Sequence, residues 1–217
     1  MMKLTTTTQI TLDGVMQGNG HTTEDDRRSG FDRGGWARGK GDDETRRFIN
    51  ETYQRADAFL LGRRTYEVFA DSWGTLGEHD VPGWEPVSRA LHGRRKYVAS
   101  RTLTEATWSN VTVLSGDVVD AVRGLRATPG GELQVHGSGV LTRCLLENDL
   151  VDEMTLITVP VVLGQGRRLF PDVGPETSLD LVWSRTDTKG VTTQVFRPAG
   201  RPQHVVTDAR GRVVRNG

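Results

Sequence analysis

A glycine-rich turn at residues 137–141 carries the residue types that bind phosphate groups. It reads Gly137-Ser138-Gly139-Val140-Leu141 and follows a short apolar run from Leu133 to Val135. Glycines let an anion approach the backbone, and the free N–H groups at a helix start can hold it. An ordinary tight turn between a strand and a helix is the alternative interpretation, since the third glycine of the full dinucleotide fingerprint is absent.

Two further segments offer guanidinium and hydroxyl groups. Gly62-Arg63-Arg64-Thr65 follows the apolar run Ala58 to Leu61, and Ser100-Arg101 follows Tyr97 to Ala99. Arginine donates paired hydrogen bonds to phosphate oxygens, so both segments are candidate phosphate sites. The alternatives are a capped helix with solvated arginines for the first segment and a surface arginine for the second.

Strands that alternate with helices must position these segments. The helices are expected to begin near residues 42–44 and 64, over 118–125 and after 139. This alternation predicts a three-layer α/β fold: a mostly parallel eight-stranded sheet with helices on both faces and an antiparallel C-terminal edge. The predicted strands are 4–12, 58–61, 97–99, 111–114, 133–135, 154–163, 179–183 and 191–196.

The remaining segments are predicted from composition. The stretch from Gly18 to Gly41 is polar and glycine-rich, which is typical of either a functional loop or a disordered one, and residues 72–86 are also loop-like. Residues 1–198 are expected to form one domain. The polar tail 199–217 is either disordered or forms an extra hairpin around Gly211.

The three candidate phosphate segments reinforce one another. Each follows a strand, and parallel strands end at one edge of a sheet, where ligands bind in open α/β folds. Together they suit one extended anion with a pyrophosphate and a separate 2′-phosphate. Several arginines favour NADPH over NADH, because the 2′-phosphate distinguishes the two cofactors.

The order of the motifs is that of dihydrofolate-reductase-like proteins. The motifs are Thr11-Leu12-Asp13-Gly14, Leu61-Gly62-Arg63-Arg64-Thr65-Tyr66, Ser100-Arg101, Gly137-Ser138-Gly139 and Pro160-Val161-Val162-Leu163-Gly164-Gln165-Gly166. More narrowly, residues 2–198 resemble the C-terminal reductase domain of the bifunctional riboflavin-biosynthesis deaminase/reductases and its stand-alone relatives. The resemblance implies an eight-stranded sheet and NADPH as hydride donor.

The resemblance also implies roles for individual residues. The segment at Gly62 would hold cofactor phosphates, Ser100 and Arg101 would flank the adenosine 2′-phosphate, and the turn at Gly137 would hold the pyrophosphate. Asp13 and Met16 would line the loop beside the nicotinamide. The cofactor residues implied in this way are Asp13, Met16, Gly62, Arg63, Arg64, Thr65, Ser100, Arg101, Gly137, Ser138, Gly139, Val140 and Leu141.

Three acids compete for one further role. Dihydrofolate reductases have a carboxylate at the start of the first helix that hydrogen-bonds the pterin, and here Asp42, Asp43 and Glu44 cluster at that place. The resemblance implies that Glu44 or Asp43, or else a water, supplies a proton, and the one-turn spacing to Phe48 favours Glu44. Favourable charge at a helix N-terminus is the alternative reason for the cluster.

The function expected on this basis is NADPH-dependent reduction of a small heterocycle, either a pyrimidine riboside of riboflavin biosynthesis or a pterin-like compound. A binding module of the same fold without catalysis is an alternative from another class, and a true dihydrofolate reductase is a third. The crowded acids and the long glycine-rich loop argue against the third.

Bulk composition limits the partners. Lys+Arg and Asp+Glu both total 28, so no excess of basic residues exists to bind nucleic acid. One cysteine, no signal-like N-terminus and no apolar stretch of membrane-spanning length predict a cytoplasmic protein away from membranes. No metal site is expected, because the single cysteine cannot supply a deaminase zinc site. A homodimer is expected from the family resemblance.

Overall fold

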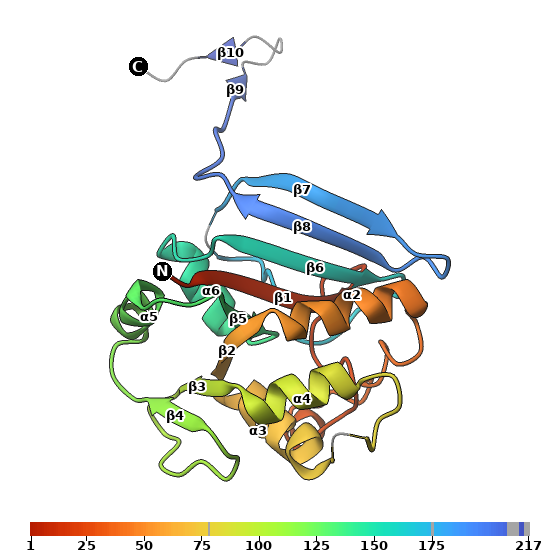
Figure 1. The fold of residues 1–217 in the computed structure, drawn as a ribbon. Helices are drawn as coiled ribbons and strands as arrows, with labels where there is room; N and C mark the ends of the chain where they lie inside the picture. The colour runs from red at the N-terminus through yellow and green to blue at the C-terminus, as the bar shows by residue number, and fades with distance from the viewer. Residues whose placement is uncertain (78, 175, 208–212, 215–217) are drawn as a thin grey trace.

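Eight strands form the main sheet of the computed structural model, which describes residues 1–77, 79–174, 176–207 and 213–214 (Figure 1). The strand order is β4-β3-β2-β5-β1-β6-β8-β7. All neighbours pair in parallel except β6 with β8 and β8 with β7. The predicted fold class is therefore confirmed. The strands are β1 (Lys3–Thr11), β2 (Ala56–Gly62), β3 (Arg95–Ala99), β4 (Val111–Leu114), β5 (Glu132–His136), β6 (Glu153–Val159), β7 (Leu179–Thr186) and β8 (Thr192–Pro198).

Helices cover both faces of this sheet (Figure 1). Side chains of α2, α3 and α4 pack into the hydrophobic cluster on one face, and those of α5 and α6 into the cluster on the other. The helices are α1 (Glu24–Arg28), α2 (Asp43–Gln54), α3 (Arg63–Ser72), α4 (Glu85–Gly93), α5 (Val118–Ala127) and α6 (Gly139–Glu147), with a short 3-10 turn at Trp73–Thr75.

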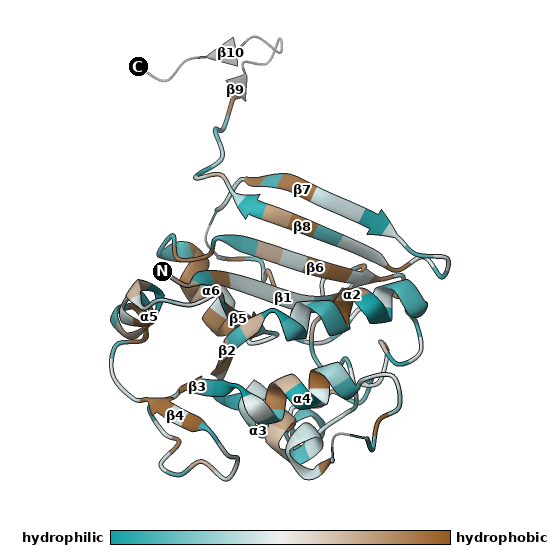
Figure 2. Cartoon of the chain, viewed as in Figure 1, coloured by the Kyte–Doolittle hydropathy of each residue, from teal (hydrophilic) through white to brown (hydrophobic). Residues whose placement is uncertain are grey.

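The alternation of side chains along β2 builds both clusters. Phe59 and Leu61 lie in the cluster beneath α2, whereas Ala58 and Leu60 lie in the cluster beneath α6. A strand buried on both faces reads as a continuous apolar run, which is why this segment is recognisable in the sequence. Figure 2 shows the hydrophobic residues of β2 and α6. Burial of each large apolar side chain contributes about 1.5–3 kcal/mol.

The two predicted loops contain helices. Within residues 18–41 the helix α1 begins at the N-cap Thr23, whose side chain accepts a hydrogen bond from the Asp26 N–H, and Asp26 bonds back to the Thr23 N–H. The predicted loop 72–86 ends where α4 begins, with Pro86 in its first turn. Proline suits that position because its missing N–H would have no helical partner there.

The C-terminal tail contains a separate two-stranded ladder. Strand β9 (Val206–Thr207) pairs in antiparallel fashion with β10 (Val213–Val214) and not with the main sheet. Residues 208–212, where the turn of the predicted extra hairpin would lie, and residues 215–217 are outside the described residues. The division of the chain into 1–198 and 199–217 stays a prediction.

Candidate active site

The structure brings the three phosphate-binding candidates together at one edge of the sheet. Strands β2, β3 and β5 are neighbours and parallel, so Gly62, Ala99 and His136 end at the same edge. The Gly62 N–H donates to Ser138 Oγ at 3.0 Å, and the Ser138 N–H donates to Thr65 Oγ1 at 3.1 Å. Arg63 donates from its guanidinium to Thr102 Oγ1 at 2.6 Å. The junctions are thus one connected surface.

Helices α3 and α6 both begin on this surface without a side-chain cap. Their N-cap residues are Gly62, which has no side chain, and Ser138, whose side chain bonds no first-turn N–H. The Ser138 hydroxyl is used elsewhere, since it donates to the His136 carbonyl at 3.1 Å. By contrast, Asp42 caps α2 and Asp117 caps α5. Two uncapped helix starts side by side present unpaired N–H donors and positive dipole ends to an anion.

The backbone conformation and the packing of the turn both require glycine. Gly137 has φ +57°, and Ser138 follows in the left-handed region at φ 51°. A Cβ added to Gly139 would lie 2.5 Å from the Met16 sulfur, so Met16 packs directly against the turn. Sequence reasoning attributed the glycines to an approaching phosphate, and the structure adds the Met16 contact. Further along the helix, Val140 is exposed and Leu141 is buried in the core.

Two arginines of the junctions, Arg63 and Arg64, have ion-pair partners. Arg63 pairs with Glu67 at 2.7 Å, and Arg64 pairs with Asp25 of α1 at 3.2 Å. Both side chains of the Arg64–Asp25 pair are more than half exposed, so the pair can exchange with solvent or an anion. Arg101 is exposed, and Ser100 Oγ accepts hydrogen bonds from the Thr102 and Leu103 N–H groups.

Asp13 joins the end of β1 to the segment after β6. Its carboxylate accepts hydrogen bonds from Thr11 Oγ1 at 2.6 Å and from the Leu163 and Gly164 N–H groups at 3.2 and 2.8 Å. The Thr11 hydroxyl, followed by the two backbone donors, lowers the pKa of Asp13 to about 2 despite some burial. Asp13 is therefore ionised at neutral pH and fixes the loop that leads to Met16.

The structure separates the three acids at the start of α2. Asp42 caps the helix and also accepts from Thr188 Oγ1 at 3.0 Å. Asp43 pairs with Arg46 at 3.0 Å, and Glu44 forms an ion pair with Arg185 of β7. These bonds lie toward the β7–β8 end of the sheet, and no described hydrogen bond joins Asp43 or Glu44 to the junction residues. Their catalytic role stays a prediction.

A buried polar network that the sequence analysis missed secures residues 17–37. Asp26 is only 4% exposed and accepts hydrogen bonds from Gln17 Nε2 at 2.7 Å and from Arg167 at 2.9 Å. Burial works against ionisation, but the hydrogen bonds outweigh it and lower the pKa of Asp26. Trp36 Nε1 donates to the Gln17 carbonyl at 2.8 Å. The Thr23-x-x-Asp26 spacing of a capping box was the available signal.

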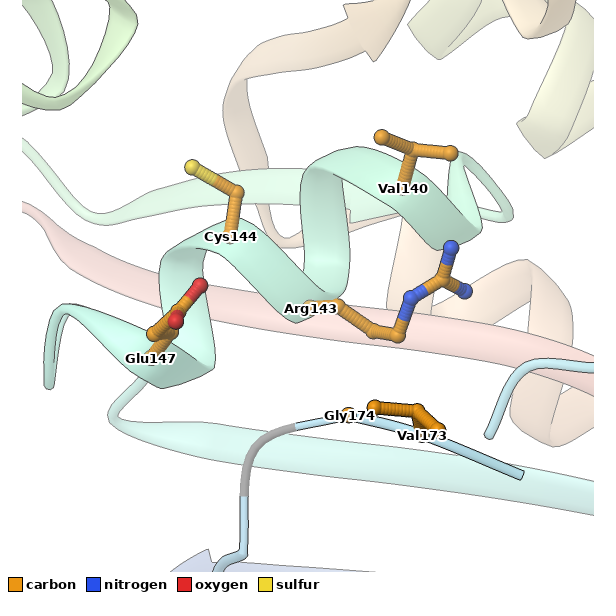
Figure 3. A pocket seen from close by; sticks show the side chains of 6 residues that line it. All are labelled: Val140, Arg143, Cys144, Glu147, Val173 and Gly174. Atoms are coloured by element: carbon orange, nitrogen blue, oxygen red, sulfur yellow. The ribbon is translucent and has the colours of Figure 1, made fainter. Parts of the chain in front are cut away.

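A cavity of about 460 Å³ lies on the outer side of α6 (Figure 3). Among its described lining residues, Val140 belongs to the junctions. Arg143, which also lines the cavity, donates from its guanidinium to the Leu169 carbonyl at 2.8 Å. This cavity is thus beside the connected junctions rather than within them. Its lining residues are Val140, Arg143, Cys144, Glu147, Val173 and Gly174.

In the described part of the chain, none of the helices has the length and apolar character needed to cross a membrane. The same part of the chain holds no group of three histidine, cysteine or acidic side chains arranged to bind a metal ion.

The sheet with its antiparallel C-terminal edge and the glycine turn between β5 and α6 form the fold that dihydrofolate reductase also has. Comparison with known families then gives a narrower result. The chain belongs to the RibD C-terminal domain family, whose model matches residues 2–193. The resemblance that the sequence motifs indicated is confirmed, and membership identifies the chain as one of a family of reductase domains.

Two curated relatives come from Bacillus subtilis (strain 168). The uncharacterized protein YyaP is 30% identical over 151 residues, which cover 69% of this chain and 76% of YyaP. The uncharacterized protein YwjB is 27% identical over 132 residues, which cover 61% of this chain and 68% of YwjB. Both matches span most of the relative's own length.

Solved structures share the fold at low sequence identity. A protein from Shewanella sp. PV-4 assigned to riboflavin biosynthesis has a TM-score of 0.66 at 22% identity and covers 91% of this chain and 99% of its own. A pyrimidine reductase-like protein from Corynebacterium diphtheriae has a TM-score of 0.56 at 16% identity, and the match covers 91% of this chain and 92% of that protein. Dihydrofolate reductase from Enterococcus faecalis, complexed with NADP(H), has a TM-score of 0.55 at 14% identity, and the match covers 90% of this chain and 96% of that protein.

Proposed function

We propose that this protein is an NADPH-dependent reductase of a small heterocycle, either a pyrimidine riboside of riboflavin biosynthesis or a pterin-like compound. Family membership supports the reductase activity. The observation that carries the cofactor assignment is the pair of uncapped helix starts at Gly62 and Ser138, joined by a 3.0 Å hydrogen bond. The same-fold enzyme from Enterococcus faecalis is described with NADP(H).

The residues of the junctions fit a dinucleotide phosphate. The first-turn N–H groups of α3 and α6 would hold the pyrophosphate, because no side chain caps them. Arg63, held toward Thr102, and the exposed Arg101 would take the 2′-phosphate from two sides. When bound, the cofactor supplies the hydride. The contribution of the chain is to orient the cofactor and the substrate and to exclude water.

Reduction of the substrate needs a proton in addition to the hydride. We propose that Glu44 or Asp43, or a water that one of them positions, supplies this proton. Glu44 is the better placed of the two to be held in one orientation, because Arg185 pairs with its carboxylate across from β7. Asp43 is largely exposed, and its ion pair with Arg46 lies within α2. An ion pair favours the charged form of a carboxylate, which has no proton to give, so a water that this carboxylate positions would deliver the proton to the substrate.

Calorimetry with NADPH and NADH tests the cofactor assignment. Wild-type protein should bind NADPH at least about tenfold more tightly than NADH, because two arginines face the extra phosphate. The variant R63A/R101A should lose this difference and bind both cofactors alike. Arg55→Ala is the control, since Arg55 pairs with Glu132 at the opposite end of β5. Equal affinity of the wild-type protein for the two cofactors would refute the 2′-phosphate assignment.

A binding module without catalysis is the second candidate. The observation in its favour is that both candidate acids are engaged in ion pairs away from the junctions. Oxidation of NADPH, followed on addition of pterins and aminopyrimidine ribosides, separates the two. Turnover establishes the reductase, and turnover of dihydrofolate that methotrexate inhibits would identify a dihydrofolate reductase. Cofactor binding without any turnover favours the module. For the reductase and for the binding module alike, we propose that the protein is cytoplasmic, because a free cysteine such as Cys144 stays reduced in the cytoplasm.

A further inference from the structure

The side chain of Gln9 lies on the α2 face of the sheet, near the carboxyl end of the central strand β1. Its register partner on β6 is Ile157, which belongs to the hydrophobic cluster beneath α2. Two residues earlier on β1, the Thr7 carbonyl accepts a hydrogen bond from the Gly137 N–H at 3.0 Å. Gln9 is only half-buried, although β1 has a neighbouring strand on each side. This polar side chain is therefore close to the glycine turn and accessible to a ligand.

The order of the strands places Gln9 between the two parts of the proposed site (Figure 1). Strands β2 and β5 lead into the helix starts that would hold the cofactor phosphates, whereas β6, β8 and β7 follow on the other side of β1. Arg185 of β7 pairs with Glu44, the candidate source of the proton. A substrate that receives a hydride from the cofactor and a proton from this direction lies over β1. This placement of the substrate rests on the proposed function.

Hydrogen bonds fix the orientation of the Gln9 amide. The Gly20 N–H donates to Asn19 Oδ1 at 2.8 Å, and a backbone N–H can only donate, so the oxygen of the Asn19 amide faces Gly20. Asn19 Nδ2 therefore donates to Gln9 Oε1, at 3.0 Å. The oxygen of the Gln9 amide is thus engaged, and its Nε2 is directed away from Asn19. The hydrogen bonds of the described residues include no acceptor for this Nε2, so its two N–H donors are available to a ligand.

We propose that Gln9 Nε2 donates a hydrogen bond to a ring carbonyl of the substrate, and that Asn19 is the positioning residue that holds the Gln9 amide in this orientation. A donor at this place pairs with a carbonyl oxygen, whereas an amino group at the same position of the ring would leave it unpaired. The substrates that fit are heterocycles with a lactam or urea carbonyl, such as a uracil ring or a pterin.

Calorimetry with two pyrimidines tests the role of Gln9. The probes are diaminouracil, which has two ring carbonyls, and tetraaminopyrimidine, in which amino groups replace both carbonyls. Each probe is titrated into protein saturated with NADP⁺. The wild-type protein should bind diaminouracil at least about tenfold more tightly than tetraaminopyrimidine, because the amino compound leaves the Gln9 donors unpaired.

Two substitutions of Gln9 have different expected effects. Gln9→Glu should reverse the preference between the probes, because a carboxylate repels a carbonyl oxygen and accepts a hydrogen bond from an amino group. Gln9→Met, which has a similar length and no amide, should abolish the preference without reversing it.

Asn19→Asp tests the positioning role. The new carboxylate still accepts from the Gly20 N–H, but it has no N–H to donate to Gln9 Oε1. The Gln9 amide should therefore rotate and donate from Nε2 to the carboxylate, which turns its oxygen toward the ligand. The preference for diaminouracil should fall about tenfold although Gln9 itself is unchanged.

A double variant and a control separate this rotation from the added charge. In the Gln9→Met background, Asn19→Asp should have no further effect on the preference, because no amide remains to rotate. Asn110→Asp makes the same chemical change at an exposed residue just before β4, at the amino edge of the sheet. It should leave the preference unchanged.

NMR of the wild-type protein provides a measurement that needs no variant. The two Nε2 protons of Gln9 should shift on addition of diaminouracil, because one of them enters a hydrogen bond. Tetraaminopyrimidine should leave them in place. Equal shifts with the two probes, or no shift at saturating diaminouracil, would overturn the role of Gln9.

Several calorimetric results would also overturn the proposal. Equal affinity of the wild-type protein for the two probes, or binding of neither, contradicts it, and so does a preference that survives in Gln9→Met. Weaker binding of NADP⁺ by Gln9→Met, with the preference intact, would assign the Nε2 donors to the cofactor. A wild-type preference in Asn19→Asp would remove the positioning role of Asn19.

Oxidation of NADPH with the panel of pterins and aminopyrimidine ribosides distinguishes this proposal from the reductase activity. Selective binding of diaminouracil without oxidation of NADPH by any compound would contradict the reductase and leave the role of Gln9 in place. Oxidation of NADPH at equal rates and with equal KM in the wild-type protein and in Gln9→Met would contradict the role of Gln9 and leave the reductase in place.

Discussion

Asp13 is a polar anchor between two distant parts of the chain. Its carboxylate holds the N–H groups of residues 163 and 164 while a hydroxyl from Thr11 supports it. The pKa of about 2 lies below the ordinary value of 3.8, so the folded state favours the ionised form. A lowered carboxyl pKa stabilises the folded state at any pH above the ordinary pKa of the group. This contribution to the free energy of unfolding disappears as the pH falls toward 2.

We expect Asp13→Asn to destabilise the protein by about 1 kcal/mol at pH 7, after allowance for solvent screening of this partly exposed group. The difference between wild-type and variant should shrink as the pH falls from 4 to about 2, because the wild-type carboxyl then becomes protonated. Urea unfolding at several pH values measures it. A difference that stays constant across this range would show that the charge of Asp13 contributes nothing.

The meeting of two candidate segments at one edge of the sheet could be predicted from residue type and position alone. Gly62 and Gly137 follow buried apolar runs, and parallel strands necessarily bring such residues to one edge. The assignment among Asp42, Asp43 and Glu44 could not be predicted, because the distinguishing partners, Thr188 and Arg185, belong to a hairpin far along the chain. Local sequence gives no indication of that contact.

At the scale of elements, α1 connects the loop 18–41 to the start of α3. Asp25 contacts Arg64 at 3.2 Å, so a carboxylate of the loop occupies a guanidinium that a cofactor phosphate would use. We expect Asp25→Asn to strengthen NADPH binding by up to about fivefold, because an exposed ion pair contributes at most about 1 kcal/mol. Calorimetry measures the change.

Glu24→Gln is the matched control, because the ion pairs of Glu24 with Arg27 and Arg28 lie within α1. It should leave NADPH binding unchanged. Weaker binding by Asp25→Asn would mean that Asp25 supports the site instead of competing with the phosphate.

The strands were more predictable than the short helices. All eight strands of the main sheet were expected, since apolar runs between turn residues are recognisable when both faces are buried. Helix α4 was missed because its apolar positions, Val87, Ala90 and Leu91, follow a stretch rich in glycine, proline and tryptophan. Helix α1 has a single buried residue, Asp26, so it has no hydrophobic period to detect.

At the scale of the whole molecule, the described hydrogen bonds of Arg201 and His204 to the domain lie at exposed positions. Arg201 donates to the Glu176 carbonyl, and His204 pairs with the Glu176 carboxylate at 2.8 Å in an exposed position. A chain that ends at Gly200 should therefore melt within about 4 °C of the full chain, because exposed pairs contribute little. Calorimetric scans of both chains measure this. A much larger drop would place the tail within the domain and contradict the boundary near residue 198.

The place of β1 in the sheet has a consequence for protein synthesis. Its two neighbours are β5 and β6, which follow far later in the chain. A ribosome releases β1 long before either partner exists, so both of its edges remain open during that interval. Its buried positions include Thr5, Thr6 and Thr8 where a central strand usually has valine or isoleucine. Threonine keeps the β-branched shape but makes an unpaired strand less prone to aggregate, which suits a segment that must wait for its partners.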